Sequence, residues 1–119
     1  MNWKINKDKP ICPQLYEYIC MKIVTGDFKA NEKLLSVREF AMNVGVNPNT
    51  VKRSYELLEQ DEIIYSIRNS GTYVSEDISI AEETIKKLRC EKTEEYFSEM
   101  EALGLDREET KKFVKEMTL

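Results

Sequence analysis

The residues of this 119-residue chain that could do chemistry are suited to binding rather than to catalysis. Asn49, Thr50, Lys52 and Arg53 stand close together and combine amide, hydroxyl and cationic groups. Such groups hydrogen-bond to base edges in the major groove of DNA and pair with phosphates. The sequence holds no histidine, no nucleophile beside a base and no glycine-rich phosphate loop. An enzyme is therefore the weakest alternative, because paired carboxylates are the only catalytic grouping left. We expect no catalytic residues.

Each charged residue also has a structural explanation. An isolated Lys-Arg pair such as Lys52 and Arg53 is usually a solvated part of a helix face. Arg38 differs, because no residue one helical turn away can pair with its guanidinium. The positions three and four residues from it hold Leu34, Leu35, Ala41 and Met42.

The three cysteines, Cys12, Cys20 and Cys90, do not form a recognisable metal site. Their number is odd, they show no C-x-x-C spacing, and no histidine can join them as a ligand. We expect no metal and no other cofactor. We interpret the cysteines as reduced packing residues, with redox sensing as the alternative.

Composition and charge limit the possible partners. With 41% hydrophobic and 34% charged residues, the chain has the balance of a globular protein. Its length allows one modest domain, or a small domain that carries an appendage with little core of its own. Residues 1–75 carry 10 basic and 9 acidic side chains, whereas residues 76–119 carry 8 and 13. The net charge of −4 thus comes from the second part, and a surface of the first part can still be locally positive at physiological salt.

The chain also lacks signals for membranes or export. No segment approaches the roughly 18 consecutive apolar residues of a membrane span, and residues 1–9 lack the apolar core of a secretory signal. We expect a cytoplasmic protein with no membrane partner.

The hydrophobic pattern predicts a mainly α fold with a small β-hairpin. Apolar residues recur at helical spacing in five segments, and two strand-forming runs flank the polar turn Arg68 to Gly71. Helices are expected over residues 13–25, 37–44, 48–60, 79–103 and 106–117, and the hairpin over residues 63–74.

Two short helices separated by a glycine turn and followed by a hairpin give the element order of a winged helix-turn-helix. Ser36 with Glu39 forms a capping box at the start of the first helix, Gly45 ends it, and Asn47-Pro48 begins the second. The second helix could enter the major groove, with the hairpin tip beside it. A winged helix used for protein assembly is the alternative.

The same segments resemble a known family. Residues 16–74 are similar to the DNA-binding domain of the GntR family of bacterial repressors, in the S-V-R-E motif at 36–39, the G-V-N-P-N-T-V motif at 45–51 and the G-T-Y-V motif at 71–74. The chain departs from the usual pattern at Leu35, where proline is common, and at three positions where glycine is common. Those three positions hold Asn31, Glu62 and Asn69. We expect the turns at Asn31 and Asn69 to form, since asparagine tolerates left-handed backbone.

The resemblance implies a binding site made by both helices and the wing. Contacts to DNA are expected from residues at the start of each helix and at the hairpin tip. The candidate DNA-binding residues are Ser36, Arg38, Asn49, Thr50, Lys52, Arg53, Arg68, Asn69 and Gly71.

The short second part indicates the branch of the family. We expect a DNA-binding domain at residues 1–75 and a helical extension at residues 76–119, as in YtrA-type regulators, whose extension mediates dimerisation. A twofold dimer would place two helices about 34 Å apart and bind a palindromic operator, usually as a repressor. The aromatic residues of the extension fit interface packing better than a ligand cage, and no small-molecule effector is assigned. The candidate dimerisation residues are Ile85, Leu88, Tyr96, Phe97, Met100 and Leu103.

Overall fold

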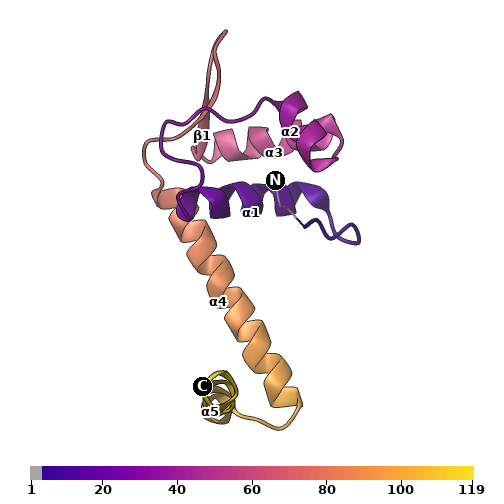
Figure 1. Ribbon diagram of the computed structural model, residues 1–119, viewed down its shortest axis with the longest axis vertical. Coiled ribbons are helices and arrows are strands. Elements are labelled where there is room, and N and C mark those ends of the chain that lie inside the picture. The colour runs from indigo at the N-terminus through magenta and orange to yellow at the C-terminus, as the bar shows by residue number, and fades with distance from the viewer. Residues whose placement is uncertain (1–3) are drawn as a thin grey trace. The chain divides into compact units, whose positions relative to one another are not determined.

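The computed structural model describes residues 4–119 as five helices and one two-stranded antiparallel sheet (Figure 1). The predicted fold class, mainly α with a small β-hairpin, is confirmed. Among residues 4–119 no helix combines the length and apolarity that crossing a membrane requires. The elements are α1 (Ile11–Val24), α2 (Val37–Val44), α3 (Pro48–Gln60), β1 (Ile64–Ile67), β2 (Gly71–Val74), α4 (Ser79–Ala102) and α5 (Arg107–Thr118).

The chain divides into two units, residues 1–85 and 86–119. The boundary lies ten residues beyond the one expected from the sequence, between residues 75 and 76. Ala81 and Ile85, in the first two turns of α4, are 1% and 6% exposed. These turns belong to the first unit because their apolar side chains are part of its core.

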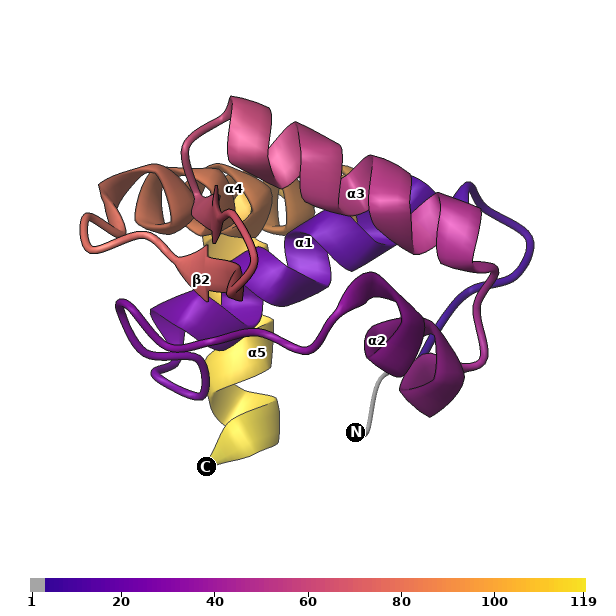
Figure 2. The same cartoon turned by 90° about the horizontal axis from the view of Figure 1, so that it is seen from above.

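The core of the first unit lies where α1, α2 and α3 meet, and α1 runs beside α3 (Figure 2). Phe40 of α2 contacts Tyr18 and Tyr55 edge to face, with ring centroids 6.4 and 6.1 Å apart. The Ser54 hydroxyl, fully buried on α3, donates to the Cys12 carbonyl at 3.0 Å. Because a buried hydroxyl needs a partner, this bond fixes how α3 lies against α1. The other buried apolar residues of the helices include Leu15, Ile19, Ile23, Ala41, Val51 and Leu58.

The predicted helix ends are present. Ser36 Oγ accepts a bond from the Glu39 amide, and the Glu39 carboxylate accepts one from the Ser36 amide. The hydrogen bond from the Ser36 amide holds the pKa of the Glu39 carboxyl group below its ordinary value. Gly45 ends α2 in the left-handed conformation, with φ of 70°. Asn47 caps α3 by accepting a bond from the Asn49 amide at 2.8 Å. These local signals set the short turn between α2 and α3.

The three cysteines are free thiols. Cys20 is fully buried on α1, and burial raises the pKa of its thiol to about 12. The thiol is therefore protonated at neutral pH, which suits a packing role and gives little thiolate for redox chemistry.

In the second unit, Arg107 at the start of α5 connects this helix to α4. The Arg107 guanidinium pairs with Glu94 at 2.6 Å and lies over the Phe97 ring, 4.4 Å from its centroid. Arg107 also holds the pKa of Glu94 below its usual value. Asp106 and Glu109 form a capping box at the start of α5.

Among residues 4–119, three residues other than glycine adopt left-handed backbone: Asn31, Glu62 and Asn69, with φ of 64°, 62° and 63°. They are the three positions where the resembled family commonly has glycine. The expectation for the two asparagines is confirmed. Glutamate lacks the local hydrogen bonding that eases this conformation for asparagine, so Glu62 carries the greater strain.

We therefore predict that Glu62→Gly stabilises the protein. Relief of left-handed strain, less the larger entropy of glycine in the unfolded chain, should raise the free energy of unfolding by about 0.5–1 kcal/mol. Urea titration followed by circular dichroism measures the change. Glu62→Ala is the matched control, because alanine removes the carboxylate but keeps the strain. An equal gain in both variants would show that the charge, and not the backbone, sets the effect.

Candidate nucleic-acid interface

One side of α3 is buried and the other side carries the predicted polar residues. Asn49, Lys52 and Arg53 are exposed, and Thr50 is half-buried. This division follows from the helical period, because the buried residues on the same helix recur at spacings of three and four. The structure thus brings four of the predicted site residues together in the first two turns of α3.

Arg38 lies in the first turn of α2 and is exposed. Within residues 4–119, its guanidinium forms neither a hydrogen bond nor an ion pair, in agreement with the lack of acidic neighbours along its helix. The neighbouring Ser36 is already engaged as the helix cap. A serine hydroxyl can donate as well as accept, so the capping role of Ser36 does not prevent a bond to a ligand.

The hairpin places Arg68 and Asn69 at its tip, both exposed (Figure 1). Tyr65 and Tyr73 face each other across the strands and stack with ring centroids 5.6 Å apart. Next to this pair on β1, the Ser66 amide donates a hydrogen bond to the Glu59 carboxylate of α3 at 3.2 Å. The bond to Glu59 holds the hairpin against α3, and the stacked tyrosines stiffen it. The tip therefore has a fixed position relative to α3.

Lys33, which the sequence did not single out, lies against Gly71 of the wing. The backbone of Lys33 forms an isolated antiparallel β-bridge with Tyr73. A Cβ atom added at Gly71 would lie 2.7 Å from Lys33 Cε. Gly71 also has φ of 152°, a conformation that side chains disfavour. Glycine at this position therefore lets an additional lysine side chain lie beside the hairpin tip.

Lys33 was missed because its contact depends on tertiary pairing. The amides of Asn31 and Leu34 donate to the carbonyls of Val74 and Thr72, so this segment runs beside β2. The sequence predicted an extended turn here, and strand-like alternation is absent from it. A basic residue two positions after Asn31 was the available signal, but nothing local linked it to the wing.

The cations of this surface are available to an anionic partner. Within residues 4–119, the ion pairs join Lys22 to Asp27, Arg107 to Glu94 and Lys111 to Glu108. None of them uses a predicted DNA-binding residue. Unpaired exposed cations can take phosphate as a partner without first losing an internal ion pair.

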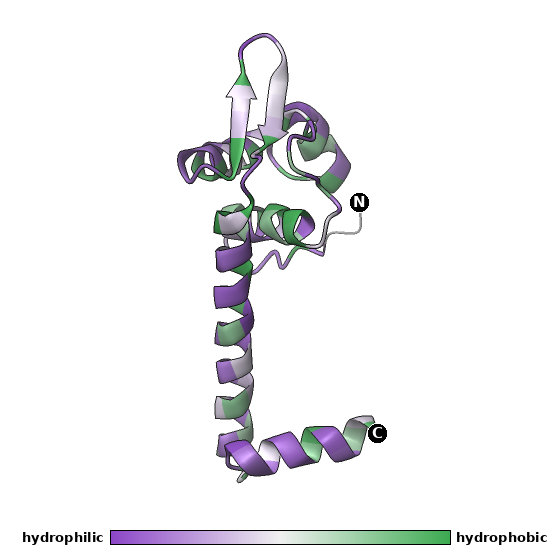
Figure 3. Cartoon of the chain, turned by 90° about the vertical axis from the view of Figure 1, so that its left-hand side faces the viewer, coloured by the Kyte–Doolittle hydropathy of each residue, from purple (hydrophilic) through white to green (hydrophobic). Residues whose placement is uncertain are grey.

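The predicted dimerisation residues differ widely in exposure. Ile85 is 6% exposed inside the first unit, which leaves little of its side chain for another protein, whereas Leu103 is 78% exposed. Tyr96 is exposed, and Leu88, Phe97 and Met100 are half-buried. Apolar positions alternate with charged ones along α4 and α5 (Figure 3). An apolar hollow of about 340 Å³ is lined by Tyr96, Phe97, Lys111, Val114 and Lys115.

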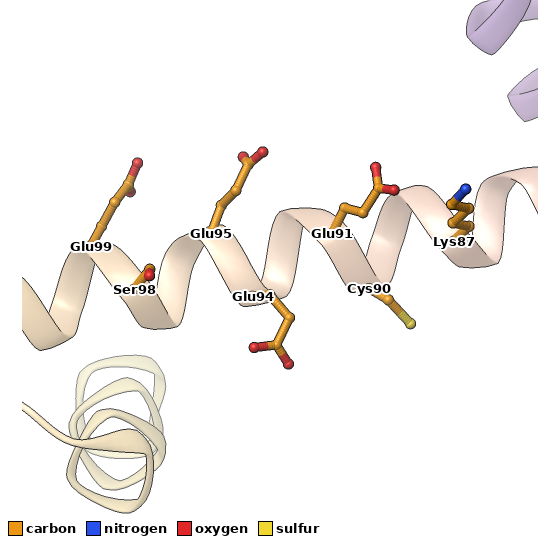
Figure 4. Close-up of a pocket in the computed structure, with 7 residues that line it drawn as sticks. All are labelled: Lys87, Cys90, Glu91, Glu94, Glu95, Ser98 and Glu99. Atoms are coloured by element: carbon orange, nitrogen blue, oxygen red, sulfur yellow. The ribbon is translucent and has the colours of Figure 1, made fainter.

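A second hollow of the same unit, of about 760 Å³, runs along α4 and is acidic (Figure 4). Glu91, Glu95 and Glu99 extend from one side of the helix, and Glu94 points to another. This surface repels phosphates and is not part of a DNA-binding face. Its other lining residues are Lys87, Cys90 and Ser98.

Comparison with known proteins agrees with this geometry. Residues 13–74 match the bacterial regulatory proteins of the gntR family. The HTH-type transcriptional regulator YhcF of Bacillus subtilis is 35% identical over 118 residues, covering 99% of this chain and 98% of YhcF. The HTH-type transcriptional repressor YtrA of the same organism is 41% identical over 68 residues, which are 57% of this chain and 52% of YtrA.

A solved structure extends the similarity to most of the chain. A GntR family transcriptional regulator from Listeria monocytogenes superposes with a TM-score of 0.82 at 42% sequence identity, over 94% of this chain and 98% of that one. The family resemblance and the winged helix-turn-helix expected from the sequence are therefore confirmed. The chain belongs to the GntR family and is a DNA-binding transcription regulator, not an enzyme.

Proposed function

We propose that the protein acts as a homodimeric repressor that binds a palindromic operator. In each copy, α3 enters the major groove and the hairpin lies alongside on the backbone or in the minor groove. The observation that carries this proposal is the exposed first part of α3, where Lys52 and Arg53 have no acidic partner among the described residues. Arg38 and Arg68 add cations from α2 and the wing.

The proposed roles follow from the chemistry of each group. Asn49 and Thr50 can hydrogen-bond to base edges, and Lys52 and Arg53 can bind bases or phosphates. The start of α3 adds the positive end of the helix dipole, and its first turn contains no acidic residue. Arg68, Asn69 and Gly71 would position the wing on the DNA backbone.

The second unit supplies the argument for a dimer. Its isolated copy leaves Leu103, Phe113 and Met117 exposed at 78%, 47% and 75%. Large exposed apolar side chains in a small helical unit favour a symmetric partner that covers them. Two copies would present two α3 helices to half-sites one helical turn apart, about 34 Å.

Repression is proposed by analogy with YtrA, which is described as a repressor. A dimer seated on a promoter would exclude RNA polymerase. Since bacterial DNA lies in the cytoplasm, we place this function there.

Binding to DNA can be tested with duplexes cut from the protein's own promoter region and selected for inverted repeats. The protein should shift such a fragment at nanomolar to micromolar concentration, with an affinity that falls steeply as salt rises. A protein that shifts no duplex at low salt would instead support a winged helix used for protein assembly.

We predict that Arg38→Ala weakens operator binding by roughly 5- to 150-fold, equivalent to about 1–3 kcal/mol. The side chain is exposed and makes no internal bond among the described residues, so the thermal unfolding temperature should not change. Gel-shift titration measures the affinity. Arg89→Ala, which removes an exposed arginine from α4, is the control for net charge. Equal affinities of the two variants would show that Arg38 is not part of the DNA interface.

We also predict that Tyr96→Glu combined with Leu103→Glu converts the dimer to a monomer. Both side chains are exposed in the single copy, so the helices should persist while burial of charge opposes association. Sedimentation velocity at micromolar concentration measures the state. Met42→Glu is the control, because Met42 is 84% exposed but lies on α2. A double variant that still sediments as a dimer would refute this interface.

A further inference from the structure

A basic hollow of about 520 Å³ lies between the segment before α1 and the start of α3. In Figure 2 this segment, drawn in indigo, runs close to the first turn of α3. Lys7 and Lys9 line one wall, and Arg53 lines the other. No acidic residue lines the hollow. The remaining lining residues are Pro10, Ile11, Cys12, Asn49 and Thr50.

Hydrogen bonds hold the lysine-bearing wall in place. Gln14 of α1 accepts a bond from the Asn6 amide at 2.8 Å, and its Nε2 donates to the carbonyls of Asn6 and Pro10 at 2.9 and 3.0 Å. The Lys9 amide donates to the Asn6 carbonyl at 3.2 Å. The segment is thereby folded into a turn against α1, although it lies outside any helix.

The two walls are also joined to each other. Ser54 of α3 donates to the Cys12 carbonyl at 3.0 Å and lies 3.2 Å from Cys12 Sγ. Since Ser54 is fully buried, this bond is shielded from water. The distance between the first turn of α1 and the second turn of α3 is thus set by the core, and the hollow is a built feature of the first unit.

The groups facing the hollow favour an anion. The side chains of Lys7, Lys9 and Arg53 are exposed and unpaired among the described residues. No side chain caps α1, and neither α1 nor α3 has an acidic residue in its first turn. Residues from the starts of both α1 and α3 therefore line the hollow, and no acidic side chain in either first turn offsets the positive end of its helix. Asp8 belongs to the same turn but does not line the hollow.

We propose that this hollow holds a phosphate group of the DNA backbone, which Lys7 and Lys9 bind from one side and Arg53 from the other. This inference depends on the proposed function, because α3 brings Asn49 and Thr50 to DNA and the hollow shares both residues. The segment before α1 thereby becomes a third DNA-contacting element, in addition to the helices and the wing. It adds affinity that does not depend on base sequence.

The number of phosphate contacts can be measured from the salt dependence of binding. We would use fluorescence anisotropy with a fluorescein-labelled duplex of mixed sequence, about two helical turns long, over roughly 50–200 mM salt. Each phosphate contact contributes about −0.9 to the slope of log affinity against log salt. Lys7→Gln combined with Lys9→Gln should make the slope less negative by about 1 to 2 and lower the affinity at the lowest salt by tenfold or more.

Lys29→Gln combined with Lys92→Gln is the matched control, because it removes two exposed lysines that lie outside the hollow. The control should keep the slope of the unmodified protein. Equal slopes and affinities in the two double variants would overturn the phosphate site while leaving the proposed function intact. Failure of the unmodified protein to bind duplex at all would instead refute the proposed function. Thermal unfolding of both variants confirms that the fold is retained.

Discussion

Burial of one side of α3 is the constraint on which the binding surface depends. Val51, Tyr55 and Leu58 recur at spacings of four and three and are at most 6% exposed. A rotation of α3 by one residue, about 100°, would expose these side chains and carry Lys52 or Arg53 into the core, where an unpaired cation is costly. The hydrogen bond from the Ser54 hydroxyl to the Cys12 carbonyl further restrains the rotation of α3 against α1. The side of α3 that we propose to face DNA is therefore defined by what the opposite side must bury.

The features that the sequence predicted well are those set by neighbouring residues. The capping box of Ser36 and Glu39, the cap at Asn47 and the left-handed Gly45 act within a few positions, so the pattern alone places the two short helices. The grouping of the α3 residues followed in the same way from the helical period. Their contacts with DNA remain a proposal, but their placement on one exposed surface was predictable.

The features that the sequence did not reveal depend on contacts between distant segments. Lys33 reaches the wing only because the residues around it pair with β2, and Lys7 and Lys9 face α3 only because Gln14 folds their segment back. The domain boundary lies later than the sequence predicted for a similar reason. Ala81 and Ile85 follow the hairpin, but their side chains are buried in the core of the first unit. Periodicity shows that a residue is buried, but not which unit buries it.

The division of charge along the chain explains how an acidic protein can bind an acidic polymer. Among the described residues, unpaired cations of the first unit lie on α2, α3, the wing and the segments before and after α1, whereas the excess of acidic residues belongs to residues 76–119. Each cation contributes little alone, because exposed charges are screened within about 8 Å at physiological salt. Phosphate contacts nevertheless multiply in the binding constant, and a twofold dimer repeats every one of them. In the proposed dimer, affinity for an operator would then depend on the number of modest contacts that one rigid surface makes at the same time, and on their doubling by the second copy.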